Sequence, residues 1–175
     1  MKKDNWIYKV FFITFFLSFM FSSISNVITN NSNLLIMILI TILVIVIGII
    51  FDMIGTATLT CNEATFHAKS SRKIKGAKES LSIIKNSVKV ASLCNDVIGD
   101  ICGIISGAMG AMVAISLSSL FKGNIALSSI IVSSVISSLT VGGKAIFKTV
   151  AMKKCDDIVF LVGKIKSIFK LKKNN

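Results

Sequence analysis

Four long apolar runs alternate with short polar or basic segments along the chain. A helix needs about 20 apolar residues to cross the hydrocarbon core of a bilayer, which is about 30 Å thick. Each run approaches or exceeds that length, and no proline interrupts any of them. The pattern therefore predicts four transmembrane helices, at residues 6–28, 34–59, 90–120 and 125–147.

The first run admits two interpretations. Lys2 and Lys3 precede its apolar core, and the small residues Ser23 and Ser25 follow it, which is the layout of a signal peptide. Its aromatic-rich core and its long apolar span favour a membrane helix that is retained. In both cases the chain starts in the cytoplasm and emerges outside after this run.

The segment between the second and third runs has the spacing of an amphipathic helix. Apolar side chains recur every three or four residues, at Ile74, Ala77, Leu81, Ile84 and Val88. Lysines occupy many of the positions between them. Residues 62–90 are therefore predicted to form one helix on the membrane surface or against the bundle. Asn62 is suited to cap its start, and Glu63 to occupy its first turn.

The tail from Lys148 onward has a second amphipathic stretch. Its predicted apolar side consists of Ile158, Leu161, Ile165 and Ile168, and lysines decorate the remainder. This basic tail is expected to lie in the cytoplasm, along the membrane or against the bundle.

Composition and charge fix the expected orientation. The chain has 53% hydrophobic residues, 16% charged residues and a net charge of +12, whereas a soluble domain is about a quarter charged. Three basic residues lie at the N-terminus, seven between residues 69 and 89 and nine from Lys144 onward, and only Lys122 falls on the other side. The positive-inside rule then predicts a multi-pass protein of the plasma membrane with both termini cytoplasmic. Basic clusters beside spans indicate anionic lipid headgroups rather than nucleic acid as partners.

Charged side chains inside the spans are the strongest functional signal, because a charge in hydrocarbon is costly. Asp52 lies late in the second run, and Glu63 follows three helical turns later. Asp96 and Asp100 are spaced i,i+4 early in the third run, beside Asn95, and Lys144 lies near the end of the fourth. With alternating span directions, all of these groups are expected at similar depth in the cytoplasmic half.

Stripes of small residues support convergence of the helices. Gly99, Gly103, Gly107 and Ala111 form one stripe, and Ser129, Ser133 and Ser137 form another. Such stripes let helix backbones approach closely in lipid. Because the two aspartates share the face of the glycines, they are expected to point into the bundle.

Two interpretations of the polar groups remain open. In the functional one, Asp96, Asp100 and Asn95, with Asp52 or Glu63, supply hard oxygen ligands for Mg²⁺ or another cation. In the structural one, Lys144 neutralises a carboxylate, Asn95 satisfies backbone groups and Glu63 only caps the surface helix. Two carboxylates one turn apart repel each other unless a cation, a proton or Lys144 intervenes.

Enzyme chemistry has little support in the sequence, so no catalytic residue is assigned. The single histidine, His67, has no nucleophile constellation that the sequence places near it, and no glycine-rich phosphate loop follows a strand. The four cysteines (Cys61, Cys94, Cys102 and Cys155) form no CxxC pair and are interpreted as reduced thiols that act as small apolar residues.

Three segments resemble the transmembrane domain of the cyclin M and CorB/CorC magnesium transport proteins. Residues 60–66, TCNEATF, resemble the family's small-x-x-Glu-x-Ala motif, and Gly76-Ala77-Lys78 precedes a helix that opens with Asn95-Asp96. Residues 143–151, GKAIFKTVA, resemble the family's Gly-Glu-x-x-Pro-Lys-x-x-Ala. Two departures are that Lys144 replaces the family glutamate and that the chain has no CBS pair or CorC domain.

The resemblance covers residues 34–165, with a gap between Glu63 and Asn95. It implies a three-helix core that pairs as a homodimer, with Mg²⁺ as the bound or transported ion. It also implies that Thr60, Glu63, Asn95 and Asp96 take the positions nearest the family's cation-binding residues.

The sequence thus predicts an all-α membrane protein with four transmembrane helices and a basic juxtamembrane amphipathic helix. The expected organisation is an N-terminal membrane helix with its outside loop (1–33), a three-helix transmembrane core that includes the surface helix (34–150) and a basic cytoplasmic tail (151–175). The expected function is binding or transport of a divalent cation, with Mg²⁺ as the leading candidate. The alternative is a non-transporting membrane scaffold or regulatory subunit with a structural ion-pair cluster.

Overall fold

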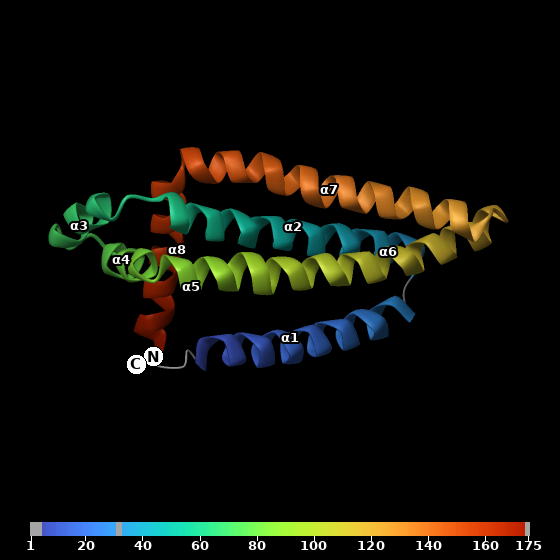
Figure 1. The fold of residues 1–175 in the computed structure, drawn as a ribbon, viewed down its shortest axis with the longest axis horizontal. Coiled ribbons are helices and arrows are strands. Elements are labelled where there is room, and N and C mark those ends of the chain that lie inside the picture. The colour runs from blue at the N-terminus through green and yellow to red at the C-terminus, as the bar shows by residue number, and fades with distance from the viewer. Residues whose placement is uncertain (1–4, 31–32, 174–175) are drawn as a thin grey trace. The chain divides into compact units, whose positions relative to one another are not determined.

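The computed structural model of the protein describes residues 5–30 and 33–173, and every regular element in this part of the chain is helical (Figure 1). In chain order the helices are α1 (Asn5–Asn30), α2 (Leu34–Thr60), α3 (Glu63–Ser71), α4 (Ala77–Lys85), α5 (Ser87–Ala91), the π-helical segment η1 (Ser92–Gly99), α6 (Asp100–Phe121), α7 (Ile125–Lys153) and α8 (Cys155–Lys173).

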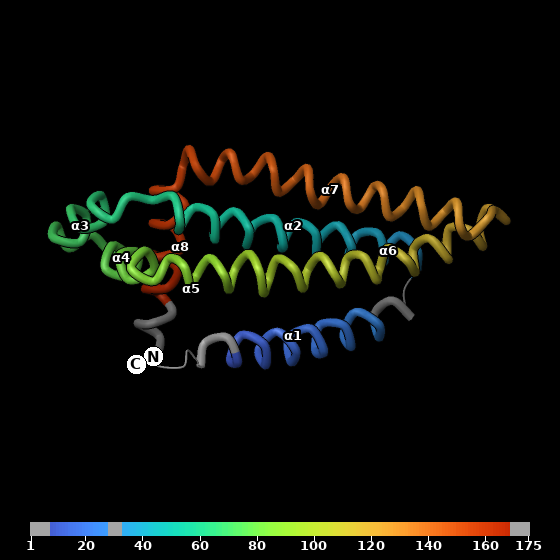
Figure 2. The backbone as a smooth tube through the Cα atoms, viewed as in Figure 1, coloured from blue at the N-terminus to red at the C-terminus, as the bar shows by residue number. Residues whose placement is uncertain are grey.

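Among the described residues, four helical spans are long and apolar enough to cross a membrane, which confirms the expected fold class. They are Tyr8–Val27, Leu34–Thr60, Ser87–Phe121 and Ile125–Lys153, the third of which runs without a break through α5, η1 and α6 (Figure 2). Many of their large apolar side chains are exposed, for example Phe16, Leu43 and Ile131. Exposed apolar side chains of this size along a 20-residue helix are what a lipid environment requires.

The chain forms two compact units, and each is described by itself. The first comprises the residues up to Ile49 together with Val97–Gly143, and the second comprises Ile50–Asp96 and the residues from Lys144 onward. The core of the first unit is built on Val97, Ile101, Ile105 and Met109, against which Val10 and Leu17 of α1 and Ile40 and Val44 of α2 pack. The large side chains of α6 therefore face α1 and α2.

The second unit has its own core, built from residues far apart in the sequence. Its fully buried members come from the end of α2, from α3, from the end of α7 and from α8, namely Ala57, Phe66, Ala151 and Val159. Ile83 and Ile84 of α4 complete the cluster. This packing fixes the short helices against the ends of two membrane spans.

The single surface helix predicted for residues 62–90 is wrong. The chain instead forms α3, α4 and α5, with a break between Ser71 and Ala77 where Lys73 has φ of 54° and Gly76 has φ of 89°. Both angles lie in the left-handed region, which ends a right-handed helix. Of the predicted apolar face, Ala77 and Ile84 are buried, but Val88 is exposed.

The caps predicted at residues 62 and 63 are confirmed. Asn62 has extended backbone angles, and its side-chain oxygen accepts a hydrogen bond from the amide of Ala64 at 3.0 Å. Glu63 occupies the first turn of α3, where a negative charge is favourable beside the unpaired amides.

Of the four residues predicted to form the apolar side of the tail, Ile158 packs against the core of the second unit. In α8 the side chains of Leu161, Ile165 and Ile168 are exposed, whereas Val159 and Gly163 are buried. The reason is a close crossing with α4, because Gly163 lies against the backbone of Gly76 and Ser80 with no room for a Cβ atom. The Ser80 hydroxyl donates to the carbonyl of Gly76 at 2.9 Å and also lies 3.2 Å from the carbonyl of Val159.

Candidate intramembrane polar site

An ion pair joins α2 and α7 in the second unit. Lys144 Nζ lies 3.8 Å from Asp52 Oδ1, and the side chains of the two residues are 26% and 11% exposed. Lys144 therefore has a carboxylate partner, as expected, and the partner is Asp52. A separation of 3.8 Å is longer than a direct charge-assisted hydrogen bond, so the attraction is coulombic rather than a tight contact.

The Asn95 side chain lies against the backbone of α2. Its carboxamide occupies the space where a Cβ atom of residue 55 would be, and only the glycine at that position leaves room for it. Asn95 belongs to η1, and π-helical turns within α-helices occur frequently at functional sites. This contact sets the amide of the third span directly on the second.

Two buried oxygen atoms at this place have no hydrogen-bond partner within the described part of the chain. They are Oδ1 of Asn95 and Oγ1 of Thr56. On α2, Asp52, Gly55 and Thr56 are spaced i, i+3 and i+4, so they share one side of the helix. Buried polar atoms are nearly always satisfied in native proteins, so two unpaired oxygens on the side of α2 that carries Asp52 call for a physical explanation.

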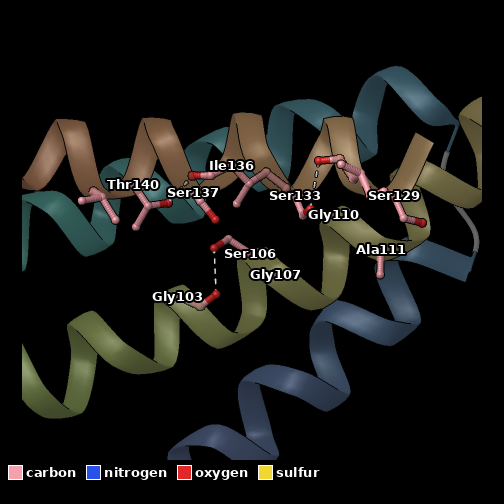
Figure 3. Close-up of a pocket in the computed structure, with 12 residues that line it drawn as sticks. Gly103, Ser106, Gly107, Gly110, Ala111, Ser129, Ser133, Ile136, Ser137 and Thr140 are labelled. Carbon is pink, nitrogen blue, oxygen red and sulfur yellow. Dashed lines mark hydrogen bonds between the residues drawn. The ribbon is translucent and has the colours of Figure 1, made fainter. Parts of the chain in front are cut away.

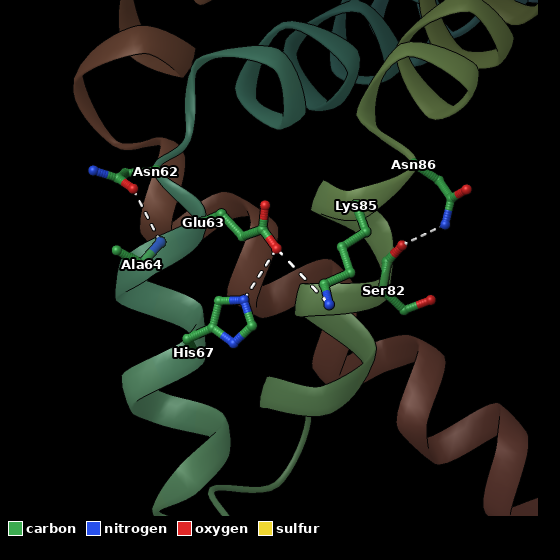
Figure 4. Close-up of polar contacts among 7 residues, drawn as sticks. All are labelled: Asn62, Glu63, Ala64, His67, Ser82, Lys85 and Asn86. Atoms are coloured by element: carbon green, nitrogen blue, oxygen red, sulfur yellow. Dashed lines mark hydrogen bonds and ion pairs between the residues drawn. The ribbon is translucent and has the colours of Figure 1, made fainter.

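Thr60 and Glu63 have local partners. The Thr60 hydroxyl lies 3.1 Å from the carbonyl of Thr56 and 3.2 Å from that of Ala57. The Glu63 carboxylate, about half exposed, lies 3.0 Å from His67 Nε2 and 3.9 Å from Lys85 Nζ (Figure 4). Glu63 thus pairs with side chains of α3 and α4, and it is not paired with a residue of the Asp52 site.

The expectation that Asp96 and Asp100 point into the bundle is wrong, because both side chains are exposed. Gly107 and Ala111 of the small-residue stripe are exposed as well, so the stripe does not mark the packed face. The packed face of α6 carries large side chains such as Ile105 and Met109. A core of large side chains occupies the interior position that the small-residue stripe was expected to take.

The stripes of α6 and α7 instead border an open groove in the first unit. It has a volume of about 420 Å³ and is lined mainly by glycine, serine and threonine residues (Figure 3). A Cβ atom added at Gly103 or Gly107 would meet nothing within 4 Å, whereas one at Gly110 would meet Ile136. The two helices therefore touch at Gly110 and diverge along the rest of the stripe.

Three of the hydroxyl groups that line the groove donate to their own helices. Ser106 donates to the carbonyl of Gly103 at 3.0 Å, Ser133 to that of Ile130 at 3.1 Å and Thr140 to that of Ile136 at 2.8 Å. Such bonds to the preceding turn are an established way for serine and threonine to sit in membrane helices.

The structure also assembles a group that sequence spacing did not reveal. Cys61 directly follows α2, and Cys155 and Asp156 open α8, yet their ligand atoms all lie within 4.8 Å of one another. Because 95 residues separate Cys61 from Asp156, no local motif announces the cluster. Among the cysteine, histidine and acidic side chains of the described residues, these three lie close enough together to share an ion.

The arrangement divides the predicted site residues into three sets. Asp52, Asn95 and Lys144 lie in one unit, where Thr56 joins them, although Thr56 was not singled out from the sequence. Thr60 and Glu63 are engaged locally, and Asp96 and Asp100 are exposed. The oxygens of Asp52, Thr56 and Asn95 are hard donors of the kind that Mg²⁺ prefers, while Lys144 supplies an internal positive charge.

Comparison of the chain with models of protein families, with curated proteins and with solved structures finds no match.

Proposed function

We propose that this membrane protein binds or transports a divalent cation, with Mg²⁺ as the leading candidate, at Asp52, Thr56 and Asn95. The observation that carries the proposal is the pair of buried oxygens, Thr56 Oγ1 and Asn95 Oδ1, that have no hydrogen-bond partner among the described residues. A hard cation would satisfy both acceptors together with the Asp52 carboxylate. The sequence resemblance to the magnesium transport family points to the same chemistry.

Lys144 controls the proposed site. Its ammonium group lies at the Asp52 carboxylate and must move away before a cation can take that place. A lysine near the end of a span can do so, because its long stem lets the amine reach the interface. The cation and Lys144 therefore compete for one carboxylate, and the lysine charge lowers the affinity for the ion.

The proposal extends to the cellular context. The one-sided distribution of basic residues supports a plasma-membrane protein with both termini in the cytoplasm. The uncovered stripe at Gly103 and Gly107 supports a homodimer, because close packing of a second copy would fill a groove that the chain itself leaves open. Pairing along this face would also remove the exposed Asp100 carboxylate from lipid.

Mg²⁺ uptake by proteoliposomes that contain the purified protein and an enclosed Mg²⁺ indicator tests the proposal. We expect the wild type to exceed empty liposomes, and we expect Asp52→Asn and Asn95→Leu to lose most of the flux. Asp157→Asn, which removes an exposed carboxylate from α8, is the matched control and should retain it. Equal flux in the wild type, Asp52→Asn and empty liposomes would refute transport, and Mg²⁺-dependent thermal stability then tests binding alone.

A non-transporting scaffold is the second candidate, and the ion pair between Lys144 and Asp52 favours it. In that function Lys144 occupies the Asp52 carboxylate permanently, so no cation binds, and the ion pair holds α2 to α7. Breaking a buried pair by removal of one partner typically costs about 3–5 kcal/mol, whereas neutral replacement of both restores much of the loss. Because Lys144 is a quarter exposed, the lower end of that range applies.

A thermal-stability series on Lys144→Met, Asp52→Asn and the double variant, each with and without Mg²⁺, separates the two functions. The scaffold predicts two unstable single variants, a rescued double variant and no response to Mg²⁺. The cation site predicts that Lys144→Met responds more strongly to Mg²⁺ than the wild type and that Asp52→Asn does not respond. Lys148→Met, an exposed lysine one turn further along α7, is the control for loss of charge.

A further inference from the structure

Three potential metal ligands meet where the end of α2 adjoins the start of α8. Cys61 Sγ lies 3.5 Å from Asp156 Oδ1, and Cys155 Sγ lies 3.9 Å from the same oxygen. All three ligand atoms lie within 4.8 Å of one another, and all three residues are half-buried. They lie in the second unit, just beyond the ends of the second and fourth spans.

The spacing suits a single tetrahedral ion. Zinc binds thiolate sulfur at about 2.3 Å and carboxylate oxygen at about 2.1 Å, which for a tetrahedron places two sulfurs about 3.8 Å apart and a sulfur and an oxygen about 3.6 Å apart. The two observed sulfur–oxygen distances, 3.5 and 3.9 Å, bracket the second value. Small side-chain adjustments would bring all three atoms onto one ion.

The helix ends that carry the ligands pack against the buried core of the second unit. Ala57, Ala151 and Val159, each 0% exposed, pack together one turn from the ligands, and Cys61 and Cys155 pack against that cluster. The amide of Cys61 donates to the carbonyl of Ala57 at 3.1 Å, so the chain keeps its helical course up to the first ligand. Ligands fixed by packing need little ordering when an ion binds.

Apolar packing alone explains the two thiols but not the carboxylate between them. Burial raises the pKa of the Cys61 thiol above its usual range, and the neighbouring Cys155 and Asp156 raise it further. The Cys61 thiol donates a hydrogen bond to Asp156 Oδ1 at 3.5 Å. A divalent cation would reverse this balance, because it replaces two thiol protons and neutralises the carboxylate.

We propose that Cys61, Cys155 and Asp156 bind one thiophilic divalent ion, Zn²⁺, which ties the end of α2 to the start of α8. Binding converts two thiols and one Zn²⁺ into a dithiolate complex and releases two protons to solvent. Half-burial of the three ligands leaves the fourth coordination position to water. Two sulfur ligands select Zn²⁺ over Mg²⁺, so this site is chemically distinct from the oxygen site at Asp52.

Co²⁺ binding to the purified, reduced, metal-free full-length protein tests the proposal, because Co²⁺ replaces Zn²⁺ and gives a thiolate-to-metal charge-transfer band. We expect the band to saturate at one ion per chain and to disappear when Zn²⁺ is added. Cys61→Ser and Cys155→Ser should each abolish it, and Asp156→Asn should weaken binding tenfold or more. Cys102→Ser, a cysteine of α6 in the other unit, is the matched control and should keep the band.

Thermal unfolding with Zn²⁺ or with a chelator provides a second measurement. Zn²⁺ should raise the midpoint of the wild type and of Asp52→Asn, but not that of Cys61→Ser or Cys61→Ala. A wild type without a thiolate band, or a band that survives in both Cys61→Ser and Cys155→Ser, would overturn the proposal. Asp52→Asn should keep the thiolate band even though it disables the proposed Mg²⁺ site. The zinc proposal can therefore be tested independently of the Mg²⁺ proposal.

Discussion

The side-chain carboxamide of Asn95 lies directly against the backbone of Gly55, so it is the group through which the second and third spans meet there. This contact buries Asn95 Oδ1 without giving it a hydrogen-bond donor. Glycine within a helix is normally unfavourable by about 0.5–1 kcal/mol relative to alanine. At position 55 the absence of a Cβ atom is a packing requirement.

Gly55→Ala should destabilise the protein by about 1–3 kcal/mol, because the added methyl group would collide with Asn95 Oδ1 and displace the amide. Thermal unfolding in detergent measures the loss. Gly142→Ala is the control, since its Cβ atom would meet nothing within 4 Å and should leave the midpoint unchanged or slightly raised. A Gly55→Ala variant as stable as Gly142→Ala would contradict the close contact.

Gly163→Ala should loosen α8 from α4. Its Cβ atom would lie 2.8 Å from both the Gly76 carbonyl oxygen and the Ser80 amide nitrogen, and backbone atoms cannot yield as a flexible side chain can. We expect faster amide hydrogen exchange throughout α8 and a loss of about 1–3 kcal/mol. Ser80→Ala, which removes only a hydroxyl, should cost about 1 kcal/mol and leave the exchange pattern of α8 nearly intact.

Gly107→Ile should disrupt the homodimer and leave the single chain folded. A side chain at this position has open space within the chain, but it would fill the groove that a second copy is proposed to enter. Mass measurement of the protein in mild detergent or nanodiscs follows the oligomeric state. Gly142→Ile, also in open space but outside the groove lining, should remain dimeric, and a monomeric wild type would rule out the dimer.

Zinc affinity should rise with pH. The raised pKa of Cys61 keeps the thiol protonated at neutral pH, so an ion must displace protons, and acid opposes binding. With two protons released, the affinity changes by up to about 100-fold per pH unit over the range in which both thiols are protonated. Competition with a chelator of known pH dependence measures this slope, and a flat profile would mean that thiolates are not the ligands.

The orientation can be tested by cysteine labelling in a cysteine-free background. Lys78→Cys should react with a membrane-impermeant reagent only after the cells are opened, whereas Asn31→Cys and Gly123→Cys should react from outside. The reason is the concentration of basic residues on the side that carries Lys78. Labelling of Lys78→Cys in intact cells would reverse the topology.

The sequence predicts the spans well because their signal is strong and local. The second run was expected to end at Leu59 and does so within one residue, since an unbroken series of large aliphatic side chains admits little else. The prediction of one helix over residues 62–90 failed because the left-handed conformations of Lys73 and Gly76 break the helix without changing the apolar spacing of the sequence. The side of α8 that packs on α4 was not predicted, because a glycine, Gly163, rather than a large apolar residue lies at that contact.

The candidate site shows the same division between local and distant signals. Asp52 and Lys144 were recognised because charges within apolar runs stand out. Thr56 was missed because a threonine in a helix has many innocuous roles, and only its unpaired hydroxyl distinguishes it. The Cys61, Cys155 and Asp156 cluster depends on a contact between residues 95 positions apart, which spacing within one segment cannot reveal.

Three hydroxyl groups of the groove are hydrogen-bonded within their own helices. Ser106, Ser133 and Thr140 each donate to a carbonyl of the preceding turn of their own helix. No water needs to be stripped from these donors when lipid, protein or solvent moves along the groove, because their bonds do not change. Filling the groove therefore breaks none of these three hydrogen bonds, so the donor groups of these side chains add little to the desolvation penalty of an occupant.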